Sequence, residues 1–307
     1  MDEWMVLDNL SKYYGKVKAL DGVSYTSRNS QVLGLIGPNG AGKTTLIRIL
    51  LGLLQRNGGI CQVLGYDVWA EAKYLKRKIG VLLDNPTYPP GATVNQYFDF
   101  VQTLFGLSSK DFSVKEWSNR LALPLDRKIN ALSAGMKRKM GLIAAICSQA
   151  EVIIMDEPTA NVDPIARNEI LNLILETSKA TETKFLISSH ILVELEKIVD
   201  SVIVLSGGQI LDEGTIFELL KKYERSNEYV CVVADPQKFI SVLQTQDWVI
   251  DASLSASQVI FRTKDNEPFQ VFQYVLELAR NTSTPLLSIS QSGSLTHIFQ
   301  EGRKKDA

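Results

Sequence analysis

Nine consecutive residues near the N-terminus, GPNGAGKTT, combine three glycines with one lysine and two threonines. The apolar run 31–36 precedes them, and an apolar helical pattern expected over 43–54 follows. Glycines let the backbone curl until successive N–H groups face a β-phosphate, and the helix presents its positive end to the same phosphates. A chance glycine-rich turn is the weaker alternative, since the whole motif stands in the required context. The expected phosphate ligands are Gly37, Pro38, Asn39, Gly40, Ala41, Gly42, Lys43, Thr44 and Thr45.

Two carboxylates, Asp156 and Glu157, follow the apolar run 152–155 directly. Adjacent acids at the end of a strand are costly unless a cation and a water use them. Asp156 can hold Mg²⁺ through water together with the Thr44 hydroxyl, and Glu157 can orient or deprotonate an attacking water. Lys43 brings its charge to the β- and γ-phosphates. The sequence thus predicts hydrolysis of a nucleoside triphosphate, although a solvated acidic loop is the alternative for the pair.

Buried strands that alternate with helices must position these groups, and this order predicts a parallel sheet with helices on its faces. Residues 85–148 interrupt the alternation with three helical patterns and are expected to form a helical insert. The charged stretch 220–228 indicates a linker. We expect strands at 4–10, 22–36, 151–155, 183–187 and 201–205, and insert helices at 94–105, 114–121 and 134–147.

A second pattern begins after the linker, in the order β-α-β-β-α-β, which is typical of a small α+β, ferredoxin-like domain. The expected division is therefore 1–221 for the nucleotide-binding domain and 228–307 for an accessory domain. Its elements are expected at 229–233, 236–243, 248–254, 258–262, 268–279 and 286–290, with a last helix at 294–300.

Composition limits the class of protein. The net charge of -1 over 307 residues argues against a dedicated nucleic-acid binder. Three widely spaced cysteines give neither a disulfide framework nor a metal site, which fits a reducing compartment. The longest apolar stretch is too short to span a bilayer, and the acidic N-terminus lacks the features of a signal peptide. We expect a cytoplasmic chain that reaches a membrane only through a partner.

Five motifs in a fixed order resemble the ATP-binding cassette (ABC) ATPases over roughly residues 3–220: GPNGAGKTT, LSAGM, IIMDEP, NVDP and SSH. The resemblance implies ATP rather than GTP, with Tyr14 stacked on adenine; Tyr13 beside it could be a core aromatic instead. It also implies that Ser133 and Gly135 of LSAGM bind the γ-phosphate held by the opposite subunit of a head-to-tail dimer. Asp163 would link the two sites of that dimer.

The resemblance also gives a role to His190, one of the two histidines of the chain. Strand 185–187 would place it at the carboxyl edge of the sheet beside Glu157. There its imidazole could contact the γ-phosphate and help to hold Glu157 and the water. Without the other motifs, a surface histidine that caps a helix is the default, and His297 keeps that interpretation.

The chain departs from the family pattern at Asp84, where a glutamine is usual. An ionised carboxylate can approach Mg²⁺ or water but cannot donate a hydrogen bond. The signature LSAGMKRKM is similar to those of drug- and antibiotic-resistance exporters. The resemblance therefore implies an exporter subunit that binds transmembrane permease subunits and a second ATPase subunit. The alternatives are a soluble ABC protein acting on the ribosome or DNA, and a small-molecule kinase.

Overall fold

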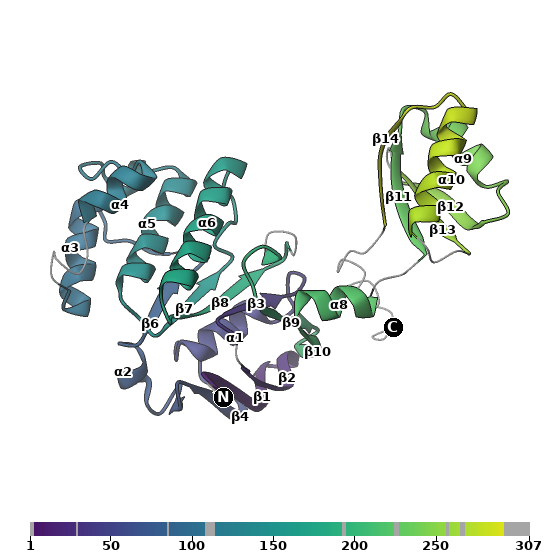
Figure 1. Ribbon diagram of the computed structural model, residues 1–307. Helices are drawn as coiled ribbons and strands as arrows, with labels where there is room; N and C mark the ends of the chain where they lie inside the picture. The colour runs from purple at the N-terminus through teal and green to yellow at the C-terminus, as the bar shows by residue number, and fades with distance from the viewer. Residues whose placement is uncertain are drawn as a thin grey trace. The chain divides into compact units, whose positions relative to one another are not determined.

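The computed structural model describes residues 3–28, 30–84, 86–107, 114–191, 195–223, 227–255, 258–264 and 268–291. The chain divides into two compact units between Ile216 and Phe217, at the start of helix α8 (Ile216–Tyr223) (Figure 1). The stretch expected as a linker from 220 is thus helical as far as Tyr223, and Leu219 in the same helix is buried. No helix in the described part of the chain has the length and apolar character needed to cross a bilayer.

The first unit contains a six-stranded sheet in the order β10-β9-β3-β8-β7-β6. All neighbouring strands are parallel except β9 and β10, which form a hairpin. The central strands β3, β7 and β8 are almost entirely buried, as expected for a sheet covered on both faces. The strands are β3 (Val32–Ile36), β6 (Ile79–Leu82), β7 (Val152–Asp156), β8 (Lys184–Ser189), β9 (Ser201–Ser206) and β10 (Gln209–Gly214).

A second, antiparallel sheet has the order β2-β1-β4-β5. Its strands are β1 (Met5–Tyr14), β2 (Val17–Thr26), β4 (Gly58–Val63) and β5 (Tyr66–Asp67). The single strand expected over 22–36 was wrong, because β2 ends at Thr26 and β3 starts a new sheet at Val32. The hydroxyl of Ser27 accepts hydrogen bonds from the N–H groups of Trp4 and Met5, which fixes the point where the chain leaves β2.

Helix α1 (Lys43–Leu50) packs between the two sheets, and its buried face joins β1 and β3 in one core. The helix was expected to reach residue 54, but it ends earlier because Gly52 takes the left-handed conformation at φ +62°. A side chain there would also collide with the carbonyl of Val68.

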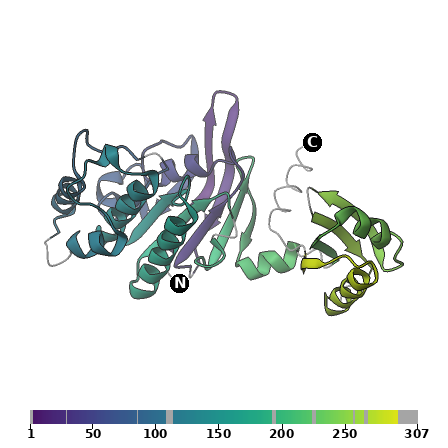
Figure 2. The same cartoon turned by 90° about the horizontal axis from the view of Figure 1, so that it is seen from above.

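Within its described residues, the first unit also contains a short 3-10 helix (Ile129–Ala131) and five α-helices between α1 and α8. The insert helices α3 (Val94–Phe105), α4 (Val114–Leu121) and α5 (Ala134–Cys147) have the expected bounds. Two views show them gathered at one end of this unit, near β6 (Figures 1 and 2). The short α2 (Ala72–Leu75) precedes them, and α6 (Pro164–Ala180) packs against α5.

The second unit has the expected order β-α-β-β-α-β and a four-stranded antiparallel sheet in the order β12-β13-β11-β14. Two helices pack on the sheet over a core that includes Tyr229, Phe239 and Phe261. This is an α+β, ferredoxin-like unit. Its elements are β11 (Glu228–Val233), α9 (Pro236–Leu243), β12 (Val249–Ser255), β13 (Gln258–Thr263), α10 (Pro268–Asn281) and β14 (Leu286–Gln291). The helix expected at 294–300, with His297, lies outside the described residues.

Candidate nucleotide-binding site

Three neighbouring parallel strands bring the motifs together at their carboxyl ends. Ile36, the last residue of β3, pairs with Ser189 at the end of β8, and Asp156 of β7 pairs with Ser188. The glycine-rich loop, the acidic pair and His190 therefore leave the sheet side by side. Ligands of open α/β sheets bind at this edge.

The glycine-rich loop needs its glycines for two physical reasons. Gly40 and Gly42 have φ angles of +83° and +107°, which L side chains rarely adopt. A Cβ at Gly37 would collide with the carbonyl oxygen of Leu205. Gly42 is also the N-cap of α1, and no side chain caps that helix in the described chain. The first N–H groups of the helix can therefore donate hydrogen bonds to a bound anion.

Lys43 is only 6% exposed, and its ammonium points back into the loop. Nζ donates to the carbonyl oxygens of Gly37 at 2.7 Å and Pro38 at 3.3 Å. The carboxylate oxygen Oε1 of Glu157 lies 3.5 Å from the same atom. The ammonium is thus paired and hydrogen-bonded, as a buried charge must be.

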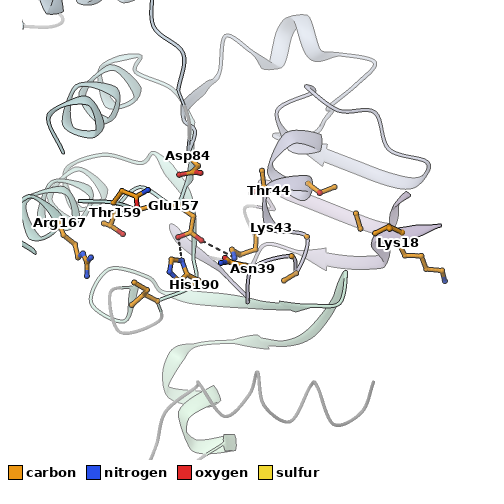
Figure 3. A pocket seen from close by; sticks show the side chains of 18 residues that line it. Lys18, Asn39, Lys43, Thr44, Asp84, Glu157, Thr159, Arg167 and His190 are labelled. Atoms are coloured by element: carbon orange, nitrogen blue, oxygen red, sulfur yellow. Dashed lines mark hydrogen bonds and ion pairs between the residues drawn. The ribbon is translucent and has the colours of Figure 1, made fainter. Parts of the chain in front are cut away.

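Glu157 connects Lys43 to His190. Its second oxygen, Oε2, lies 2.9 Å from Nδ1 of His190, so the carboxylate stands between the two side chains (Figure 3). The backbone of Glu157 has φ +48°, an uncommon value for a residue other than glycine. The Ser188 hydroxyl oxygen accepts a 2.9 Å hydrogen bond from the N–H of Glu157 and fixes this turn. A strained backbone of this kind, held in place by the surrounding structure, is often found at functional sites.

Asp156 lies deeper, with 1% of its surface exposed. Its Oδ1 accepts a 2.6 Å hydrogen bond from the Ser188 hydroxyl. A buried carboxylate with one neutral donor favours an additional cation nearby. The hydroxyl of Thr44 and the carboxylate of Asp156 are oxygen donors of the kind that Mg²⁺ prefers, so the side chains present fit that metal.

An open pocket of about 570 Å³ lies over these groups. Ten of the expected site residues line it: Asn39, Gly40, Ala41, Gly42, Lys43, Thr44, Thr45, Asp84, Glu157 and His190. Gly37 and Pro38 do not line the pocket, but their carbonyl oxygens accept hydrogen bonds from Lys43, which does. Asp84 and Glu157 lie on one side of the pocket and Thr44 on the other (Figure 3).

Tyr14 does not line this pocket. It lies at the end of β1, 47% exposed, with Nζ of Lys12 5.4 Å from its ring centroid. Tyr13 is 38% exposed and is therefore not a core aromatic. The exposed ring of Tyr14 leaves a face on which a base can stack, and the adenine contact stays a prediction.

Ser133, Gly135 and Asp163 form a separate group outside the pocket. Ser133 caps α5 through a hydrogen bond from the N–H of Met136, and Asp163 caps α6. A Cβ at Gly135 would be 3.8 Å from Oδ2 of Asp163, so the starts of the two helices adjoin. Hydrogen bonds from the backbone N–H of Ala166 and then Ile165 hold the pKa of Asp163 below its usual value. None of the three lines the pocket of its own chain, and their roles at another chain's nucleotide stay predictions.

Several lining residues were not expected from the sequence. Val17, Lys18 and Ala19 line the pocket from β2, and Thr159, Asn161 and Arg167 line it beyond Glu157. Asn161 begins the NVDP motif and Thr159 lies two residues before it, and this position is the signal that could have found part of this set. The contribution of β2 depends on pairing between distant segments and leaves no local signal.

Comparison with known proteins decides the family. The ABC transporter family pattern matches residues 20–160. The bacitracin transport ATP-binding protein BcrA of Bacillus licheniformis is 32% identical over 244 residues, which cover 79% of this chain and 78% of that protein. This chain belongs to the ABC transporter ATP-binding family. It is therefore an ATP-binding ATPase, and its fold is the ABC ATPase fold.

Other relatives support the same assignment. The Nod factor export ATP-binding protein I of Rhizobium sp. (strain N33) is 29% identical and covers 86% of this ABC chain and 88% of its own length. A crystal structure of the ADP conformation of an ATP-binding cassette has a TM-score of 0.60 at 30% identity, covering 73% of this chain and 95% of that one. An alignment of 244 residues is longer than the first unit, so the similarity to the bacitracin protein extends into the second.

Proposed function

We propose that this ABC ATPase uses Mg²⁺ and ATP to power export through separate transmembrane permease subunits. The observation that carries the proposal is the placement of Glu157 between Lys43 and His190 at the strand ends. Lys43 now balances Glu157, and the phosphates of ATP would replace the carboxylate as its partner. Glu157 would then be released towards a water, with His190 beside it.

Mg²⁺ fits next to Thr44 and Asp156. The metal would supply positive charge to the phosphate oxygens. The neutral hydroxyl of Ser188 holds Asp156 in position, so the negative charge of its carboxylate would remain to attract the metal. The proposed metal ligands are thus two residues of this chain, water and the nucleotide.

The positions of Ser133, Gly135 and Asp163 support a head-to-tail dimer as part of this proposal. These residues start α5 and α6 outside the pocket of their own chain. In a head-to-tail pair, the N-terminus of α5 from one subunit would meet the γ-phosphate bound by the other. A homodimer and a pair with a sister ATPase both satisfy this geometry.

A second pocket of about 650 Å³ supports a permease partner. Apolar and polar side chains line it in similar measure, and it lies between the loop after β6 and the N-terminal part of α5. Tyr88 anchors one wall through a 3.0 Å hydrogen bond to the carbonyl of Lys137 and an edge-to-face contact with Tyr97. We propose that a cytoplasmic helix of the permease docks here, at the inner face of the membrane. The lining includes Pro86, Thr87, Tyr88, Pro89, Pro90, Ile129 and Ala134.

Export is supported by what the relatives are named for, namely bacitracin transport, Nod factor export and linearmycin resistance. The test is co-purification of the tagged chain from solubilised membranes of its own host. We expect a polytopic membrane protein to co-elute and Tyr88→Ala to release it, while Trp69→Ala, at an exposed residue outside this pocket, does not. Sedimentation with ribosomes, without any membrane protein, would overturn the proposal.

A further inference from the structure

Asp84 presents an electrostatic problem that a glutamine at this position would not. Its carboxylate is 40% exposed and lines the pocket that holds Lys43, Thr44 and Glu157. The phosphates of ATP carry several negative charges, so an uncompensated carboxylate at this wall would repel them. A glutamine would be neutral.

Arg138 compensates that charge. Its side chain is only 6% exposed, and Nη2 donates to Oδ1 of Asp84 at 2.6 Å. Nη1 donates to the carbonyl of Leu83 at 2.6 Å, so the guanidinium holds two consecutive residues of the loop. A planar guanidinium that donates two hydrogen bonds in a fixed fork gives a well-defined geometry.

The surroundings fix Arg138 in turn. It lies on α5, and the next turn of that helix packs on the same loop, because Gly141 faces Leu82 and Tyr88. The approach is close, because a Cβ at Gly141 would be 2.8 Å from Cδ1 of Leu82 and would force that side chain to shift. The arginine therefore starts from a helix held firmly against β6 and reaches the loop from outside the nucleotide pocket, which it does not line.

We infer that Arg138 is a positioning residue for ATP binding: it neutralises and orients Asp84, which allows a carboxylate to replace glutamine at the wall of the nucleotide pocket. The inference rests on the assignment of this pocket to ATP. Arg138 itself touches no nucleotide and acts through Asp84. Its importance therefore depends on the charge of residue 84, and this dependence distinguishes the inference from a purely structural role.

The experiment is a double-mutant cycle on the full chain. The affinity for a non-hydrolysable β,γ-imido analogue of ATP, with Mg²⁺, is measured by calorimetry for wild type, Arg138→Gln, Asp84→Gln and the double variant. We expect Arg138→Gln to weaken binding about tenfold, a coupling of the size found between residues in contact. In the Asp84→Gln background the same change should alter affinity less than about twofold.

A matched control is Arg120→Gln, which removes an arginine on α4 that pairs with Glu176 and lines neither pocket. It should leave affinity unchanged. Arg138→Lys, which keeps the charge but not the fork, should lie between wild type and Arg138→Gln.

Equal losses from Arg138→Gln in both backgrounds, or no loss in the wild-type background, would overturn the inference. If Arg138→Gln does not fold, the other two variants still test the inference. The double variant must then bind the analogue with near wild-type affinity, and Arg138→Lys must bind it more weakly than wild type. Lys43→Ala is measured in parallel: retained affinity there would show instead that the pocket is not the ATP site.

Discussion

Oε2 of Glu157 lies 2.9 Å from Nδ1 of His190, although the two residues are 33 positions apart in the chain. Two parallel strands, β7 and β8, create this proximity because Asp156, directly before Glu157, pairs with Ser188, which lies two residues before His190. The arrangement gives a candidate base and its partner fixed positions before any nucleotide binds. Single substitutions at Lys43, Glu157 and His190 can therefore test the role of each residue separately.

Lys43→Ala should abolish ATP binding or leave it very weak. The loop holds the Lys43 ammonium where it can bind the phosphates, and the variant removes that charge. Calorimetry with ATP and Mg²⁺ measures the effect. The variant also leaves Glu157 without its neighbour at 3.5 Å, so the melting temperature is recorded to show that the chain is folded. Unchanged nucleotide affinity would contradict the assignment of the loop.

Glu157→Gln keeps the size of the side chain but removes its ability to accept a proton. We expect ATP to bind normally, hydrolysis to nearly stop, and dimers to accumulate with ATP and Mg²⁺. Turnover and size-exclusion chromatography with and without ATP give the two readouts. Hydrolysis at the wild-type rate would refute the role of Glu157 as the base.

Much of this site could be predicted from the sequence because the glycine-rich loop, the acidic pair and His190 each follow a strongly apolar strand. The helices α3, α5 and α9 also matched their expected bounds, since their apolar residues repeat at helical spacing. The strands β4, β5 and β6 carry weaker signals: they are short, and only two residues of β4, Cys61 and Val63, are buried.

Other parts of the site depend on contacts between distant residues. Arg138 lies 54 positions from Asp84, and nothing in the local pattern of either residue connects them. The same holds for Val17, which enters the pocket only because β2 passes beside the loop. Within the chain, the Ser133 hydroxyl only caps α5, so its expected contact with a nucleotide of another subunit stays a prediction.

The three cysteines should be unreactive in the folded chain. All three are free and buried, and burial raises the pKa of Cys61 and of Cys231 to about 12 and that of Cys147 further. An exposed thiol ionises near pH 8.5, and the thiolate is the reactive form. A thiol-specific disulfide reagent at pH 8 should label no cysteine before unfolding and three afterwards.

These pKa shifts also fix the sign of one pH effect. A thiol whose folded pKa is raised stabilises the fold fully below the unfolded value, about 8.5, and loses that contribution as the pH rises towards 12. The urea concentration at the midpoint of unfolding should therefore decrease as the pH is raised from 8 to 10. This decrease should be smaller in Cys61→Ala. A labelled thiol in the folded chain would contradict both expectations.

Removal of residues 229–307 should leave ATP binding intact. The core of the second unit, which includes Tyr229, Phe239 and Phe261, is separate from the core around α1. We expect the truncated chain to bind ATP with wild-type affinity and to differ in dimerisation or transport. A truncated chain that is folded but cannot bind ATP would show that the two units are not independent.

His190→Ala separates a γ-phosphate contact from a helix-capping role. ADP lacks the third phosphate, so its affinity should stay close to that of wild type. A charge-assisted hydrogen bond contributes about 1.5–3 kcal/mol, so its loss in the transition state should slow hydrolysis roughly tenfold to a hundredfold. His190 is half-exposed, which makes a large loss of stability unexpected.

Three measurements on that variant decide the matter: ADP affinity, melting temperature and turnover per folded molecule. A capping histidine predicts a lower melting temperature with unchanged turnover. His190→Gln is the matched control, because its amide can still donate a hydrogen bond but cannot become a cation. Partial activity of His190→Gln and very low activity of His190→Ala would show that the hydrogen bond contributes more than the charge, since only the alanine variant loses the donor.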